Sequence, residues 1–119
     1  MATLRVRIEE VGDTLAGVAQ AWRSAETDVK ETRDATLAFG SWEDVHRVLA
    51  PKRLAIVRAM TGHGTLSIRE VARRVGRDFK SVHSDVDTLW RNGVLDKSSQ
   101  GIVFPYDRIH LEFDIEAAA

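Results

Sequence analysis

The stretch from Ser67 to Gly93 constrains the fold more than any other part of the chain, because it carries two helical patterns separated by a glycine. Ser67 can cap the first helix, and Glu70 stands three residues later, which is the spacing of a capping box. Apolar residues then recur at the helical period up to Gly76, the residue type that most readily takes the positive φ of a helix end. Asp78 can cap the second helix. The stretch therefore predicts two helices joined by a tight turn.

The second helix, which is expected to end at Asn92–Gly93, is predicted to bury one face and to expose a basic face rich in hydroxyl groups. Its buried face comprises Phe79, Val82, Val86, Leu89 and Trp90. Its outward face comprises Lys80, Ser81, Ser84, Asp87, Thr88 and Arg91. In a helix-turn-helix, the second helix lies in the major groove of DNA with its N-terminal residues toward the bases. The pattern favours this arrangement over a helical hairpin whose outer face is merely solvated.

The residues after Gly93 predict a β-hairpin. Val94–Leu95 begins a short strand, Ser98–Gly101 is rich in turn-forming residues, and Ile102–Phe104 returns as a second strand. A helix-turn-helix followed at once by a hairpin is a winged helix. We therefore expect a fold that is mainly α with a small β component, built as a winged helix-turn-helix with an N-terminal strand-helix appendage.

The positive charge of the chain is concentrated where the two helices are predicted. The net charge of the whole chain is −1, but residues 46–83 hold nine Lys/Arg and two Asp/Glu, a sum of +7. Residues 1–45 and 84–119 each sum to −4. Neutralising DNA phosphates requires a local basic surface rather than a basic protein, so this distribution supports the DNA-binding interpretation.

The N-terminal segment is predicted to form a unit of its own. Residues Thr3–Ile8 alternate apolar and polar side chains, which indicates a half-buried strand. A helix follows, whose apolar stripe ends at Trp22, and residues 26–36 are polar and aperiodic, as in a linker. We expect residues 1–39 to form a strand-helix unit and linker for dimerisation or partner binding. Residues 40–116 are then the winged helix-turn-helix DNA-binding domain.

Two further segments flank the central stretch. A helix is predicted to start at Ser41, with Trp42, Val45, Val48 and Leu49 facing inward. At Pro51 either a kink or a break is expected. After the hairpin, residues 108–115 alternate again, and a strand of this length needs a partner. That partner is the N-terminal strand of the same chain or of a second copy.

Three runs of the sequence carry a family resemblance. They are Leu49–Leu54, Leu66–Val86 and Phe104–Leu111. The chain resembles small prokaryotic winged-helix regulators that are loosely MarR-like and are often described as antitoxins of toxin–antitoxin systems. The resemblance extends to the N-terminal strand and to Ala21–Arg23, and it departs at Ala50, where a threonine is expected. It implies DNA binding and, more narrowly, an antitoxin role with a toxin protein as partner.

The candidate site residues follow from the predicted docking of the second helix and the wing on DNA. They are Ser67, Arg69, Arg77, Lys80, Ser81, His83, Ser84, Thr88 and Lys97. Asp85 and Asp87 oppose this interpretation, because carboxylates repel phosphates. Asp85 could hold a neighbouring arginine, and Asp87 could lie beyond the contact or accept a hydrogen bond from a cytosine amino group.

Enzymatic and metal chemistry are not expected. The chain has no cysteine, and its four histidines lack the spacing of a helical metal site. No nucleophile elbow or glycine-rich phosphate loop is present. We therefore expect no catalytic residue, no metal and no cofactor. No apolar run approaches the length of a membrane span, so a cytoplasmic protein without membrane contact is expected.

The predicted function is that of a sequence-specific DNA-binding transcription regulator, a repressor that acts on double-stranded DNA as a homodimer. Two alternatives stay open. In one, the predicted winged helix binds an acidic protein partner. In the other, the chain is a repressor that senses a small ligand, although residues 26–36 show no pocket-forming pattern.

Overall fold

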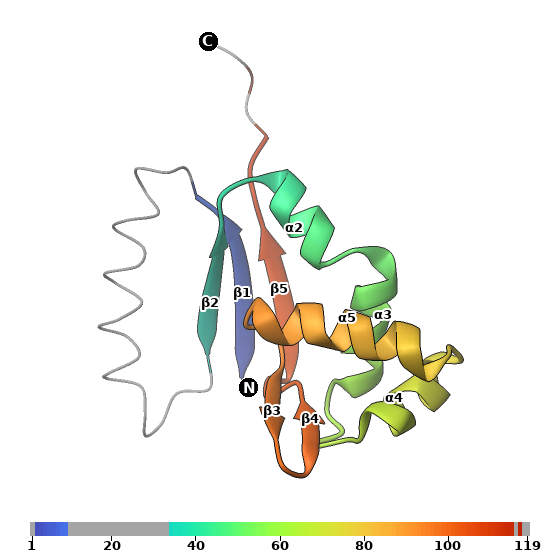
Figure 1. Cartoon of the computed structure of the whole chain (residues 1–119). Helices are drawn as coiled ribbons and strands as arrows, with labels where there is room; N and C mark the ends of the chain where they lie inside the picture. The colour runs from blue at the N-terminus through green and yellow to red at the C-terminus, as the bar shows by residue number, and fades with distance from the viewer. Residues whose placement is uncertain (1, 10–33, 116, 118–119) are drawn as a thin grey trace.

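The computed structural model describes residues 2–9, 34–115 and 117 (Figure 1). The elements within these residues are β1 (Thr3–Ile8), β2 (Ala35–Phe39), α2 (Trp42–Val48), α3 (Pro51–Met60), α4 (Ile68–Val75), α5 (Phe79–Arg91), β3 (Asp96–Ser98), β4 (Gly101–Val103) and β5 (Arg108–Glu112). The predicted helix whose stripe ends at Trp22, and most of the predicted linker, lie outside the described residues.

Strand β1 is the centre of a three-stranded parallel sheet, with β2 on one side and β5 on the other (Figure 1). Leu4 of β1 lies opposite Ala35 of β2 and Ile109 of β5, so the apolar residues of all three strands share one face. Leu4 and Val6 are buried, whereas Arg5 between them is exposed. The alternation of Thr3–Ile8 is thus confirmed as a half-buried strand.

The first residues of β1 are tied to distant parts of the chain. The backbone N–H of Ala2 donates to Asp107 Oδ2 at 2.7 Å, and the N–H of Asp107 donates back to the Ala2 carbonyl at 2.8 Å. The N–H of Thr3 donates to Asp34 Oδ1 at 2.9 Å. Both carboxylates precede the strands that flank β1, so each fixes the register of its strand against β1.

This sheet shows that the predicted fold class is wrong. The described residues form a mixed α/β fold with a parallel sheet, not a mainly α winged helix-turn-helix with an appendage. The pairing of β1 with β5 of the same chain was one of the two alternatives predicted for residues 108–115. The pairing of β1 with β2 was not predicted, because residues 35 and 36 were assigned to the polar linker. Because β1 pairs with β5 of the same chain, the sheet joins the predicted unit 1–39 to the predicted domain 40–116; that division itself stays a prediction.

The helices begin where the sequence places caps. Ser41 Oγ accepts a hydrogen bond from the Asp44 N–H at 3.1 Å, and α2 follows. Helices α2 and α3 are separate, so the chain breaks at Pro51 rather than kinking. The Ala50 side chain caps nothing, but Pro51 at the first helical position has no N–H that would need a partner.

The hairpin β3–β4 packs beside the N-terminus of α4. Leu66 and Ile102 exchange backbone hydrogen bonds, N–H to carbonyl, at 2.8 Å in both directions. Gly101 lies next to this bridge with φ of 139°, and a Cβ atom there would overlap the Leu66 carbonyl. Only glycine therefore allows the hairpin to approach the start of α4 so closely.

One hydrophobic core lies between the apolar face of the sheet, the helices and the hairpin. Its largest fully buried members include Leu4, Ile56, Met60, Leu89, Leu95 and Ile102. Three aromatic residues predicted to face this core do not enter it: Trp42, Phe79 and Trp90 are 46%, 42% and 39% exposed. Each stands in the first or last turn of its helix. No helix among the described residues is long and apolar enough to cross a membrane.

Candidate nucleic-acid interface

Helix α5 starts from a fixed turn. Helix α4 ends at Gly76, whose φ of 69° reverses the chain, and Asp78 caps α5 two residues later. Asp78 Oδ2 accepts a hydrogen bond from the Ser81 N–H at 2.9 Å, and this bond lowers the pKa of the Asp78 carboxyl. A carboxylate at this position also meets the positive end of the helix dipole. The first turn of α5, where base contacts are predicted, is therefore held in one orientation.

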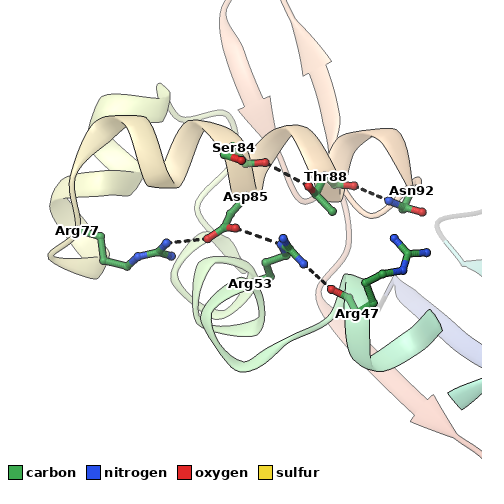
Figure 2. Close-up of polar contacts among 7 residues, drawn as sticks. All are labelled: Arg47, Arg53, Arg77, Ser84, Asp85, Thr88 and Asn92. Atoms are coloured by element: carbon green, nitrogen blue, oxygen red, sulfur yellow. Dashed lines mark hydrogen bonds and ion pairs between the residues drawn. The ribbon is translucent and has the colours of Figure 1, made fainter. Parts of the chain in front are cut away.

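Asp85 connects α5 to helix α3 and to the α4–α5 turn (Figure 2). Its Oδ1 accepts from Arg53 Nε at 3.1 Å, and its Oδ2 accepts from Arg77 Nη2 at 2.7 Å. Arg53 belongs to α3, and a second nitrogen of its guanidinium donates to the Arg47 carbonyl at the end of α2. The Asp85 side chain is only 14% exposed, so water screens these contacts weakly. Asp85 thus sets the position of α5 relative to α3 and the α4–α5 turn.

These contacts show the role of Asp85, which the sequence left open, and they place the predicted phosphate contact Arg77 in an ion pair. Asp85 holds neighbouring arginines, which was one of the predicted possibilities. Arg77, a predicted phosphate contact, directs its charge to Asp85, and its Nη1 atom is buried without a hydrogen-bond partner among the described residues. A phosphate contact by Arg77 stays a prediction, and the ion pair must open or share its charge for the contact to form.

Hydroxyl groups line the middle of α5. Thr88 Oγ1 donates to the Ser84 carbonyl at 3.3 Å, and the Thr88 carbonyl accepts from Asn92 Nδ2 at 2.8 Å (Figure 2). Ser84 is exposed, whereas Ser81 and Thr88 are half-buried. Lys80 and His83 are exposed in the first turns. These five candidate residues therefore lie along one helix, with the most exposed ones toward its N-terminal half.

A second group of candidates surrounds a shallow groove of about 380 Å³ between the helices and the hairpin. Ser67, Arg69 and Lys97 all line it, together with Phe79 and the turn of the hairpin. The Arg69 guanidinium lies 5.0 Å from the centre of the Phe79 ring. Lys97 Nζ lies 4.3 Å from the Trp90 ring, so an aromatic face positions each cation. The structure therefore gathers eight of the nine candidates in two places, along α5 and around this groove, and Arg77 lies in the turn before α5.

Much of the local positive charge is neutralised within the protein. Glu70 accepts hydrogen bonds from both Arg73 and Arg74 on α4, and these bonds lower the Glu70 pKa to about 2. Asp87, whose role was left open, pairs with Arg91 Nε at 2.8 Å. Among the described residues of the helices and the hairpin, the cations that make no ion pair are Lys52, Arg58, Arg69, Lys80 and Lys97. Three of these five were predicted contacts.

The sequence interpretation missed the aromatic side chains of the interface. Phe79 and Trp90 were assigned to the core because they match the helical period of the buried stripe. A usable signal was their position: both stand at helix ends, and Phe79 directly follows the cap Asp78. The contacts between these rings and cations, such as Lys97 on Trp90, could not be predicted from the sequence, because the two partners lie on different elements. Within the described ranges, no group of three or more His, Asp or Glu is placed to hold a metal ion.

Comparison with known proteins gives one match. A sequence model of the HVO_A0114 family matches residues 48–111, from the end of α2 to β5. The match includes the Asp85 contacts, the groove and all nine candidate residues. No curated protein and no solved structure matches the chain.

Proposed function

This chain belongs to the HVO_A0114 family, and from the geometry of α5 and the groove beside it we propose that it is a sequence-specific DNA-binding transcription regulator. The observation that carries the proposal is the orientation of α5. One side of the helix is held by the buried contacts of Asp85, while Lys80, His83 and Ser84 are exposed in its first turns. A helix presented in this way, from a fixed turn, suits insertion into a major groove.

The side chains on and around α5 suit two kinds of DNA contact, with cations for the phosphates and hydroxyl groups for the bases. Lys80, Arg69 and Lys97 make no ion pair within the described part of the chain, so each can neutralise a phosphate without breaking an internal ion pair. Ser81 and Ser84 carry short hydroxyl side chains, which can donate to or accept from base edges. In this function the cations supply affinity for any duplex, and the hydroxyls contribute sequence preference.

The experiment is a binding titration with random and selected duplexes over a range of salt concentrations. Replacing Lys80 with Ala should weaken binding to all sequences and flatten the salt dependence by about 0.9 per lost phosphate contact. Arg5→Ala is the matched control, because Arg5 is an exposed arginine on the face of the sheet that points away from the core. Equal effects of both changes would contradict the docking on α5. A wild-type protein that shifts no duplex at low salt would instead favour an acidic protein partner.

The proposal includes a homodimer, because one α5 helix reads only a few base pairs and paired half-sites are the usual remedy. It also includes a cytoplasmic location and repression as the regulatory outcome. The antitoxin role is its narrowest part and is supported by the sequence resemblance alone. Co-expression with the product of the neighbouring reading frame tests it: a toxin partner should co-purify with this chain and arrest growth when this chain is withheld.

A further inference from the structure

Strand β5 has an open edge. In the three-stranded sheet it pairs with β1 along one side, and no described strand pairs along its other side (Figure 1). Four of its five residues are exposed, including Leu111 at 38%. An exposed edge strand presents unpaired N–H and carbonyl groups to any complementary strand, and proteins usually cover such edges or pair them.

The residues of β5 complement their own reversal. Arg108, His110 and Glu112 lie on the polar face of the sheet, and Ile109 and Leu111 lie on the apolar face. If a second β5 runs antiparallel to the first with His110 opposite His110, each Arg108 meets a Glu112 of the other copy. On the apolar face, each Ile109 meets a Leu111. Oppositely charged and apolar pairs of this kind stabilise antiparallel strands.

We propose that two copies of this chain pair through β5 in antiparallel orientation, with His110 on the two-fold axis, to form one continuous six-stranded sheet. The inference rests on the homodimer in the proposed function and specifies its interface. Among the possible axes, the one at His110 is the one that pairs all five residues of β5, Arg108 to Glu112. An axis between two residues would bring polar side chains onto the apolar face of the partner.

A second copy suits this edge better than an unrelated strand, because the two-fold axis forms the Arg108–Glu112 pair twice from a single sequence. The same side chains are already positioned within the chain. Arg108 Nε donates to Thr3 Oγ1 at 2.9 Å, and Glu112 lies 3.5 Å from Arg7 Nε. Arg7 therefore stands beside the Glu112 carboxylate, and a partner's Arg108 would add a second cation to that carboxylate. The edge is thus charged in a pattern that favours its own copy.

The first test uses the absence of cysteine in the natural chain. In His110→Cys the introduced thiols of two copies face one another across an antiparallel pair, where Cα atoms lie about 4.5–5.5 Å apart, a distance that a disulfide can span. Mild oxidation should therefore give a covalent species of twice the 13.3 kDa chain mass. Thr36→Cys, on the polar face of β2, is the matched control and should stay monomeric under denaturing conditions. Preferential cross-linking of Leu111→Cys would move the axis and overturn the proposed register.

The second test exchanges charges between copies. Arg108→Glu alone and Glu112→Arg alone each place like charges opposite one another, and each should raise the dimer dissociation constant roughly tenfold. Mixed in equal amounts, these two variants should form a heterodimer of near wild-type affinity, because both cross-strand pairs are then opposite in charge. Circular dichroism of each single variant checks that it is folded. Folded variants that fail to complement each other would overturn the pairing.

Failure of this inference and failure of the proposed function are distinguishable. If His110→Cys yields no covalent dimer while the wild-type chain still binds duplex DNA with the expected salt dependence, the β5 interface is wrong and the DNA-binding proposal stands. If the covalent dimer forms but no duplex is bound, the interface is correct and the DNA-binding proposal is wrong.

Discussion

The sheet and the helical region of this protein are held together in different ways. In the α4–α5 region, most fixing contacts join residues fewer than ten positions apart, such as the cap at Asp78 and the ion pair between Arg77 and Asp85. In the sheet, β1 is fixed by partners on strands that are far away in the sequence, for example Arg108 on Thr3. The caps and the turn that orient α5 are therefore fixed locally, whereas the sheet requires strands from both ends of the described chain.

The sheet should be the more sensitive region to the loss of a single apolar side chain. Leu4 is fully buried between β2 and β5. Leu4→Ala should lower the free energy of unfolding by about 2–5 kcal/mol, through lost burial and the cavity left behind. Urea unfolding followed by circular dichroism measures the change. Arg5→Ala, next in the strand but exposed, should stay within about 0.5 kcal/mol of wild type; equal losses would mean that the apolar face of β1 is misassigned.

The helical region should depend most on Asp85. Asp85→Asn weakens two charge-assisted hydrogen bonds and leaves Arg53 and Arg77 partly buried without an anion. We expect a loss of roughly 1–3 kcal/mol in the free energy of unfolding, together with weaker binding to a selected duplex. Asp87→Asn is the matched control, because its pair with Arg91 is exposed and should contribute at most about 1 kcal/mol. Wild-type stability in the Asp85 variant would refute the view that this carboxylate positions α5.

Loss of a hydroxyl group on α5 should reduce the preference for a selected DNA sequence more than it reduces the affinity for DNA in general. Ser84→Ala removes the hydroxyl group of an exposed side chain that does not pack in the core. If it contacts a base edge, binding to the selected duplex should weaken by about 1–3 kcal/mol, while binding to random duplex hardly changes. Ser81→Ala gives a second measurement of the same kind. Parallel losses on both duplexes would reassign these residues to the DNA backbone.

The smallest effect is expected from the Glu70 ion pairs, and it should depend on pH. The Glu70 pKa is lowered from 4.5 to about 2 by hydrogen bonds from Arg73 and Arg74. The carboxylate therefore stabilises the folded state fully above pH 4.5 and loses that contribution as the pH falls toward 2. Glu70→Gln should show a slightly lower melting temperature than wild type at pH 6, with the difference shrinking toward pH 2. A difference that grows on acidification would contradict the assignment.

The sequence predicted the local elements well because their determinants are local. The caps at Ser41, Ser67 and Asp78, the glycine turn at Gly76 and the hairpin all depend on neighbouring residues, and the structure confirms them. The first strand of the hairpin, however, starts at Asp96 and not at the predicted Val94. For the candidate site, its residues could be named, but their partners could not. That Arg77 turns to Asp85 while Lys97 covers Trp90 depends on distances between elements, which periodicity does not encode.

The fold class was mispredicted for a related reason. Alternation predicted strands at residues 3–8 and 108–115; the structure confirms the first and ends the second at Glu112. Because residues 35 and 36 were assigned to a linker, β2 and hence the three-stranded sheet were not predicted. The carboxylates of Asp34 and Asp107 add to the pairing by accepting the N–H groups of Thr3 and Ala2. Aspartate is a common residue in the turns that precede strands. Nothing in the sequence distinguishes these two from the others.

The central position of β1 also has a consequence for the order in which the protein is made. Among the three strands of this sheet, the ribosome synthesises β1 first and β5 last, and Arg108 follows Thr3 by 105 positions. At elongation rates of about 5–20 residues per second, β1 emerges roughly 5–20 s before the strand that completes the sheet. The helix caps and the α4–α5 turn, whose contacts are local, can form during that interval, while Leu4 and Val6 remain uncovered on the β5 side. The nascent chain therefore exposes an apolar strand that can aggregate from the time β1 emerges until β5 is available to pair with it.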